Sequence, residues 1–290
     1  MQNKEWYYCG TGNCKKMSGM IQTAEEMEQL VVRNGFMPFF SNGIPDFSIE
    51  EETPAELWFD DECPGPWEWK GTVIGMGSAA YGKFFDNKAG YVRLDLFPDF
   101  LNYRRRGLSA EAALKHDWLT KDEGLVLQTV VDHQSLLTTE LRRLCGYTKP
   151  RSAKLSPIEK QAERSAKQAG LSIKKVNRNT GLPSQDAGQP SHTAVQPRSA
   201  GRREGLETAI THLQMKGYLV TIDFEYKYDR EGKRYGWGVA RYCTPEDCYG
   251  ANILDGVRGR SPEQSYARLF QFLRHQLPQA TDEQLHQLLR

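Results

Sequence analysis

Apolar residues recur at helical spacing near the start of the chain. Met27, Leu30 and Val31 fall on one side of a helix drawn over residues 22–34. Gly35 follows directly, at the position where a glycine commonly ends a helix. The pattern therefore predicts an amphipathic helix with its apolar side turned toward a core.

Helix and strand signals alternate over the next segment. A helix is predicted to begin near Trp67, after two prolines. Residues 81–85 and 91–94 are rich in aromatic and β-branched side chains and flank a polar turn, which predicts a β-hairpin. Another helix is predicted through residues 97–106, ended by Gly107.

Residues 120–148 predict two short helices joined by a polar turn at 133–135. The side chains expected to face the core are Leu125, Leu127, Val130 and Val131 from the first helix and Leu137, Leu141 and Leu144 from the second.

Residues 202–243 predict a third helix followed by a second β-hairpin. Leu206, Ile210 and Leu213 recur at a period of 3.6 residues. A strand with alternating apolar and polar residues follows over 218–228, and a polar turn then precedes the returning strand. The opposite, outward face of the helix is expected to carry Glu207, Thr208, Thr211 and Gln214.

Three helices followed by a hairpin are the element order of a winged helix-turn-helix, a module that usually places one helix in a groove of DNA. We expect an α+β protein of tandem winged helix-turn-helix units with a C-terminal helical segment. The predicted divisions are a tail over 1–19, a helix-plus-hairpin domain over 20–118, a winged helix over 119–250 and a helical segment over 251–290.

A basic, low-complexity insert interrupts the predicted winged helix over residues 150–201. It is rich in Ser, Gln, Pro, Gly, Lys and Arg and has no periodic apolar face, so we expect a disordered insertion. Between Lys149 and Arg203, 12 Lys and Arg residues face three acidic residues, although the net charge of the whole chain is only +1. Such an arm attracts phosphate backbones; a solvated linker with incidental charge is the alternative.

Composition indicates an ordinary soluble protein. The 290 residues are 39% hydrophobic and 26% charged, and no apolar run approaches the roughly 20 residues that cross a bilayer. The N-terminus lacks the apolar core of a secretory signal, and six cysteines in this length do not suggest a disulfide framework. We therefore expect a cytoplasmic protein with no membrane partner.

Duplex DNA is the expected partner of the winged helix, with cations and short polar side chains at the contact. Glu204 and Glu207 oppose this interpretation because carboxylates repel phosphate. A non-catalytic regulatory or protein-interaction module is the alternative, since winged helices also bind proteins. The residues expected to contact DNA are Arg202, Arg203, Thr208, Thr211, Lys227, Arg230, Lys233 and Arg234.

Two further groups of residues each have two interpretations. Arg104, Arg105 and Arg106 end a predicted helix, where they either complement the helix dipole or bind phosphates. An aromatic group either forms the core of the N-terminal half or stacks on flipped bases. Its members are Trp58, Phe59, Trp67, Trp69, Tyr81, Phe84 and Phe85.

Cofactor signals are sparse. Cys9 and Cys14 share a Cys-x4-Cys spacing with Cys243 and Cys248, which suits a structural zinc site if the two pairs meet; independent reduced thiols are the alternative. The sequence contains no phosphate-binding P-loop, no Rossmann glycine motif and no serine-hydrolase elbow. We expect no cofactor and no nucleotide cofactor.

Three long stretches of the chain are distinctive: residues 67–105, 205–247 and 261–289. Together they resemble the bacterial AlkZ-related proteins, which are compact relatives of the AlkZ/YcaQ winged-helix DNA glycosylases. The similarity to AlkZ-related proteins covers most of residues 20–148 and 202–290. The resemblance implies tandem winged helices and a role in the repair of alkylated or crosslinked DNA.

The larger glycosylase family excises bases with a short Gln-x-Gln or Gln-x-Asp motif, which this chain lacks. Base excision needs a group that positions or deprotonates water beside a sugar that becomes cationic. The nearest candidates are the carboxylates Asp46 and Glu50, with Glu51 beside them, and an acidic surface loop is the alternative interpretation. Activity as an N-glycosyl hydrolase is therefore left open.

Overall fold

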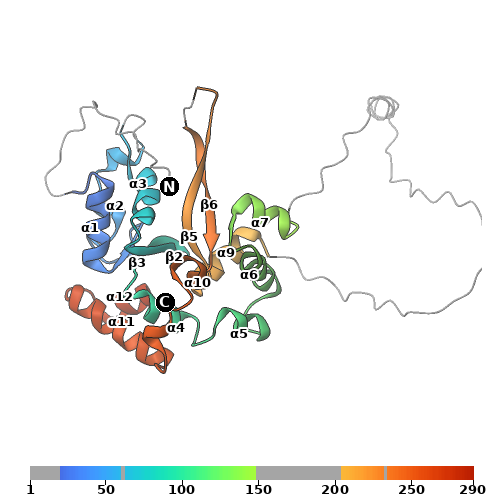
Figure 1. The fold of residues 1–290 in the computed structure, drawn as a ribbon. Helices are drawn as coiled ribbons and strands as arrows, with labels where there is room; N and C mark the ends of the chain where they lie inside the picture. Colours follow the sequence, from blue (N-terminus) through green and yellow to red (C-terminus); the bar gives the residue numbers. More distant parts are fainter. Residues whose placement is uncertain (1–19, 60–62, 148–203, 232–233) are drawn as a thin grey trace, which may run out of the picture. The chain divides into compact units, whose positions relative to one another are not determined.

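The computed structural model describes residues 20–59, 63–147, 204–231 and 234–290 as a mixed α/β protein (Figure 1). The predicted tail and the predicted basic insert lie outside these residues. The described strands form one antiparallel sheet in the order β1-β3-β2-β5-β6-β4. They are β1 (Phe36–Pro38), β2 (Ala79–Phe85), β3 (Lys88–Arg93), β4 (Ser135–Leu137), β5 (Val220–Tyr228) and β6 (Arg234–Cys243).

The first predicted helix is confirmed as α1 (Ala24–Asn34). The hydroxyl of Thr23 accepts the backbone N–H of Glu26 and caps the first turn. Met27, Leu30 and Val31 are buried, as predicted. Gly35 ends the helix at φ 73°, a left-handed conformation that favours glycine.

Two short helical segments and one longer helix follow. They are α2 (Ile49–Glu52), the 3₁₀ helix η1 (Ala55–Trp58) and α3 (Pro66–Met76). Helix α3 begins one residue before the predicted start because proline is well suited to the first helical position. It packs against α1 and against β5.

The hairpin of β2 and β3 turns more tightly than predicted. Asp86 and Asn87 both adopt left-handed backbone conformations, with φ of 47° and 64°. Two such residues form the kind of turn that suits the twist of a β-hairpin. Strand β3 therefore begins at Lys88, inside the predicted turn.

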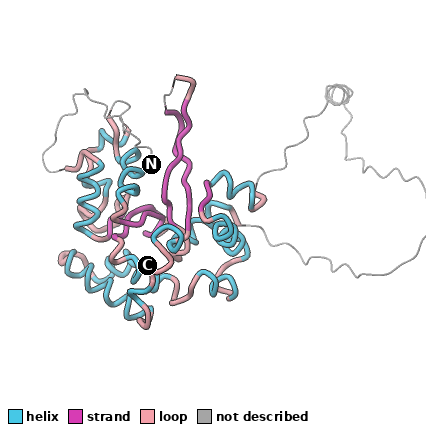
Figure 2. The backbone as a smooth tube through the Cα atoms, in the orientation of Figure 1, coloured by secondary structure: helices cyan, strands magenta, loops and turns pink. Residues whose placement is uncertain are grey.

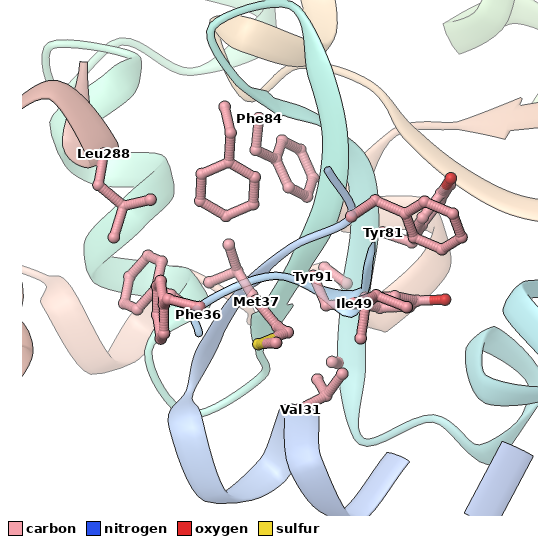
Figure 3. Packing of buried hydrophobic residues seen from close by; sticks show 14 of the residues in the cluster. Val31, Phe36, Met37, Ile49, Tyr81, Phe84, Tyr91 and Leu288 are labelled. Atoms are coloured by element: carbon pink, nitrogen blue, oxygen red, sulfur yellow. The ribbon is translucent and has the colours of Figure 1, made fainter. Parts of the chain in front are cut away.

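Helices from both ends of the chain share the main core. Helix α4 (Phe97–Arg104) packs against α11 (Pro262–Gln276), which in turn contacts α12 (Asp282–Leu289). Figure 3 shows Phe36, Phe84 and Leu288 turned into the same buried cluster, although they belong to β1, β2 and α12. Helix α11 begins at the Ser-Pro pair, with Ser261 as its N-cap and Pro262 as its first residue.

The elements predicted as a winged helix are present in the predicted order. They are α6 (Lys121–His133), α7 (Thr138–Leu144), α9 (Leu206–Met215) and the hairpin of β5 and β6, which is the long pair of magenta segments in the tube of Figure 2. Helix α6 packs against both α7 and α9. Strand β4, between α6 and α7, was not predicted; it pairs with β6. The remaining elements are α5 (Ala110–Lys115), α10 (Pro245–Tyr249) and the 3₁₀ helix η2 (Asp255–Val257).

The predicted inward faces of α6 and α7 are partly wrong. Leu127, Val130 and Leu141 are buried, but Leu125, Val131 and Leu144 are exposed. Val126 is buried instead, because residues 126 and 130 lie four positions apart on one face of the helix, whereas residue 125 is rotated by about 100°.

The aromatic group of the N-terminal half belongs to the core. Trp58, Trp69, Tyr81, Phe84 and Phe85 are buried, and Trp67 packs against the same cluster. Phe59 is the exception, since 84% of its surface is exposed. The group is therefore structural, apart from this one side chain.

One sheet spans the predicted division at residue 118. Tyr81 of β2 pairs with Thr221 of β5, and the described residues up to Cys145 and from Glu204 onward belong to one compact unit. The predicted domain boundaries stay a prediction, but the two halves share a hydrogen-bonded sheet. Every helix within the described ranges falls short of the length and apolarity needed to span a membrane.

Candidate nucleic-acid interface

Helix α9 is buried along much of its length. Thr208 is exposed, as predicted, but Thr211 and Gln214 are buried, so the prediction that these two face outward is wrong. The Thr211 hydroxyl accepts a hydrogen bond from Lys83 Nζ at 3.1 Å, and Gln214 Oε1 accepts the Lys83 backbone N–H at 3.0 Å. Strand β2 covers this side of α9. The sequence of α9 alone contains no sign of that cover.

The exposed residues of α9 lie in its first turn, which also carries the predicted DNA contact Thr208. Glu207 is exposed there, and its carboxylate forms an ion pair with Arg142 of α7. Thr208 stands beside it as a short hydroxyl side chain. The acidic charge that opposed a DNA contact is therefore partly neutralised within the protein.

The basic residues of the β5–β6 hairpin differ in their surroundings: some are exposed, and one forms an ion pair. Lys227 and Arg230 are exposed, as expected of residues that contact a partner. Arg241 instead forms an ion pair with Glu225 on the neighbouring strand, with Nε at 3.1 Å from Oε1. Of the other predicted contacts, Arg202, Arg203 and Lys233 lie outside the described residues, and Arg234 is described by its backbone position at the start of β6.

The three consecutive arginines at the end of α4 lie in three different environments. Arg105 is buried and structural: its Nε donates to the carbonyl of Gly217 at 3.0 Å, and both terminal nitrogens donate to the carboxylate of Glu246. This contact ties the end of α4 to Gly217, two residues after α9, and to α10. The structural interpretation therefore holds for Arg105.

Arg104 and Arg106 have no carboxylate partner among the described residues. Arg104 donates to the backbone carbonyls of Phe84 at 2.9 Å and Met215 at 3.2 Å, and its Nε is buried without an acceptor. Burial lowers the pKa of Arg104 to about 10. Arg106 is exposed, and its guanidinium lies 4.4 Å from the ring centre of Trp118.

Both arginines line a cavity of about 870 Å³. Its walls come from the end of α4, the segment before α6, the end of α9 and the start of α11. Tyr103, Trp118 and Tyr266 supply aromatic surface, and Lys216 and Arg290 supply two further cations. Glu263 supplies a carboxylate, which accepts a hydrogen bond from Ser261.

A buried ion network joins α6 to α9. Glu123, on α6, is 1% exposed and lies 2.7 Å from Lys216 Nζ and 3.3 Å from His212 Nδ1. His212 also lies 3.0 Å from Glu204. These three carboxylate and imidazole groups are close enough to hold a metal ion. Because the Lys216 ammonium already supplies the counter-charge, we assign the group to helix packing.

Neither carboxylate candidate for base excision sits in an enclosed site. Asp46 is exposed and adopts a left-handed φ of 55°. Glu50 is exposed too, and its carboxylate accepts the backbone N–H of Ser41 at 2.9 Å. Neither residue lines the 870 Å³ cavity or a second one of about 320 Å³ beside Ser41. Their surroundings match the alternative interpretation, an acidic surface loop.

The cysteines divide into different chemical states. Cys243 and Cys248 are free thiols; Cys243 Sγ donates to the carbonyl of Thr244 at 3.0 Å, and hydrogen bonding with the Cys243 side chain lowers the pKa of Cys248. Cys63 is in a disulfide, which the expectation of independent thiols did not include. Cys9 and Cys14 lie outside the described residues, so the zinc site that combines the two pairs stays a prediction.

The cavity brings together residues that the sequence did not single out. Trp118 follows α5, Tyr266 is on α11, and Arg290 follows α12, so they meet only through the packing of segments distant in the sequence. The one local signal was the run of arginines at 104–106. Sequence spacing placed these residues at a helix end, but it gave no sign of an aromatic wall opposite.

Comparison with known proteins identifies one family. The sequence profile of the family described as "AlkZ related" matches residues 21–290. No curated protein and no solved structure shows a significant match to the chain. The matched range covers nearly the whole chain, in agreement with the resemblance found from the sequence.

Proposed function

We propose that this chain, which belongs to the AlkZ-related family, is a winged-helix protein that binds duplex DNA and acts in the repair of alkylated or crosslinked DNA. The observation that carries the proposal is the order α6-β4-α7-α9-β5-β6 with α6 packed on α9. That order is the one in which winged helices present a hairpin to DNA. Family membership adds the association with repair.

In this proposal, most contacts with DNA come from the β5–β6 hairpin, and α9 contributes only its exposed first turn. Thr211 is engaged by Lys83, so Thr208 is the hydroxyl of α9 that remains exposed. Lys227 and Arg230 are exposed on the hairpin, where they are available to phosphates. Arg202, Arg203, Lys233 and Arg234 stay in this proposal as contacts predicted from the sequence.

Fluorescence anisotropy with a labelled duplex tests the proposal at about 50 mM and about 200 mM salt. Removing two charges through Lys227→Gln and Arg230→Gln is expected to weaken binding roughly tenfold and to reduce the salt dependence by about two phosphate contacts. The matched control removes two exposed cations elsewhere, Lys115→Gln and Arg258→Gln, and is expected to bind like the original chain. Equal weakening by both double variants would count against a hairpin contact.

A protein-interaction role is the second candidate, and the buried face of α9 favours it. A groove-reading helix needs an exposed polar face, whereas the exposed first turn of α9 carries Glu207 paired with Arg142. If the winged helix binds protein instead, the anisotropy measurement is expected to show no binding of duplex DNA at low salt. Unchanged cellular activity of the Lys227→Gln, Arg230→Gln variant would then support this candidate over DNA binding.

Base excision is a separate question from binding. We assign no catalytic role to Asp46 or Glu50, because both are exposed and lie outside the described cavities. Incubation with an alkylated or crosslinked duplex, followed by a search for abasic sites, measures excision directly. Abasic sites that disappear with Asp46→Asn but persist with Glu25→Gln, an exposed acid on α1, would restore Asp46 as a candidate.

A further inference from the structure

The 870 Å³ cavity between α4, α9 and α11 has the size and chemistry of a ligand site. Small-molecule sites in proteins commonly measure about 300 to 1,000 Å³ and combine apolar walls with a few polar anchors. Here the walls include Tyr103, Trp118 and Tyr266, and the anchors are guanidinium groups. This site is distinct from the hairpin cations proposed to contact duplex DNA.

The cavity has an excess of positive charge. Lys216 is neutralised by Glu123, but Arg104, Arg106 and Arg290 form no ion pair within the described part of the chain. Glu263 is the one acidic side chain of the lining, and it is engaged with Ser261 Oγ at 2.7 Å. The lining side chains therefore include three guanidinium groups without an ion pair and one carboxylate, a balance that favours an anionic ligand.

Two local features show that the conformations of Arg104 and Arg106 are energetically unfavourable in the protein alone. Arg104 is largely withdrawn from water, and its Nε has no acceptor. Arg106 adopts a left-handed φ of 52°, which is uncommon for a residue other than glycine. That conformation places its guanidinium over the Trp118 ring. An anion in the cavity would supply the opposite charge that neither guanidinium receives from a carboxylate of the described residues.

The start of α11 adds to the attraction. This helix has 15 residues, and its first turn, at Pro262 and Glu263, lines the cavity. The N-terminal end of a helix carries partial positive charge and favours anions. Guanidinium groups in particular pair with phosphate through two parallel hydrogen bonds.

We propose that the cavity binds a nucleotide, with its phosphate held by Arg104 and Arg106 and its base against the aromatic wall of Trp118 and Tyr266. Aromatic rings and guanidinium groups together recognise the two halves of a nucleotide, and stacking on aromatic rings tolerates any base. The nucleotide comes either from solution or from a phosphorylated end of a DNA strand. Both sources present the same chemistry to the cavity.

Calorimetry with deoxyadenosine 5′-monophosphate and the full chain tests the proposal. We expect the nucleotide to bind at least roughly tenfold more tightly than deoxyadenosine, which lacks the phosphate. Arg106→Gln and Arg290→Gln, both at exposed positions, are each expected to weaken nucleotide binding roughly fivefold or more. Arg258→Gln, an exposed arginine outside the cavity lining, is the matched control and is expected to leave binding unchanged.

Two oligonucleotides identify the source. One is a DNA strand with a 5′-phosphate, and the other is the same strand with a 5′-hydroxyl. Displacement of the nucleotide by the phosphorylated strand alone indicates that the cavity binds a strand end. Displacement by neither strand indicates that it binds a free nucleotide. Equal affinity for nucleotide and nucleoside, equal weakening by Arg258→Gln, or no binding at millimolar nucleotide overturns the proposal. The Lys227→Gln, Arg230→Gln variant is expected to keep nucleotide binding, which separates a failure of this proposal from a failure of the hairpin contact.

Discussion

Arg105 and Glu246 form a bidentate ion pair across 141 positions of the sequence. Arg105 is 1% exposed, and its Nε also donates to the carbonyl of Gly217. One guanidinium therefore joins the end of α4, the second residue after α9 and helix α10. This contact fixes the C-terminal end of α9 against the main core, beside the cation-lined cavity.

The ion pair makes stability depend on pH. Burial raises the pKa of Glu246, but the hydrogen bond and charge of Arg105 outweigh burial, so the pKa is lowered overall. Because the folded pKa lies below the unfolded value of about 4.5, the pair stabilises the fold above that pH. The contribution is lost as pH falls through the folded pKa.

Replacement of Glu246 by Gln is expected to remove this dependence. At pH 7 the variant should lose about 1 to 3 kcal/mol, since a buried guanidinium loses its charged acceptor. The difference from the original chain should shrink as pH falls from about 5 to about 3. Urea unfolding at several pH values measures it, and a difference that stays constant with pH would contradict the assignment.

Lys216 compensates the buried carboxylate of Glu123. Lys216→Met leaves Glu123, which is 1% exposed, without its nearest cation and is expected to cost about 3 kcal/mol in the free energy of unfolding. The matched control is Lys115→Met, because Lys115 pairs with Glu111 on the exposed surface of α5. Chemical denaturation should show no measurable change in the control. A similar small effect in both variants would show that the α6–α9 network does not stabilise the fold.

Gly90 and Gly124 are expected to respond in opposite directions to alanine. A Cβ at Gly90 of β3 would lie 2.4 Å from the Phe85 ring and 2.7 Å from the Met37 carbonyl, so Gly90→Ala should destabilise by about 1 to 3 kcal/mol. Gly124 lies inside α6 with open space around it, so Gly124→Ala should stabilise by about 0.5 to 1 kcal/mol. Thermal denaturation of the two variants tests both signs. A loss of stability in Gly124→Ala would show that the surroundings of α6 differ from those described.

Of the three cysteines that form no disulfide in the described part of the chain, Cys248 is expected to have the most reactive thiol. The hydrogen bond from Cys243 lowers its pKa, against an opposing effect of burial, and Tyr249 lowers it further. Alkylation by iodoacetamide, followed by peptide mass spectrometry across pH, should modify Cys248 before Cys145 or Cys243. Cys243→Ala should move the Cys248 profile to higher pH. An unmoved profile would rule out the thiol–thiol hydrogen bond as the cause.

Local patterns predicted much of the secondary structure. The apolar period of α1, the Ser-Pro start of α11 and the alternation of β5 each depend on neighbours in the sequence, and each element formed where its residues indicated. Errors arose where burial depends on remote segments. Leu125 and Val131 fitted an apolar face of α6, but α7 and α9 cover the face that carries Val126.

By itself, the sequence determined the element order, most helix ends and membership of the AlkZ-related family. Only the tertiary structure decided which side of α9 is buried, that one sheet runs through both halves, and that Arg104, Arg106 and Trp118 line one cavity. The physical reason is the range of the interactions. Helix caps and periodicity act over a few residues, whereas a packed face or a cavity is made by segments that the chain brings together only on folding.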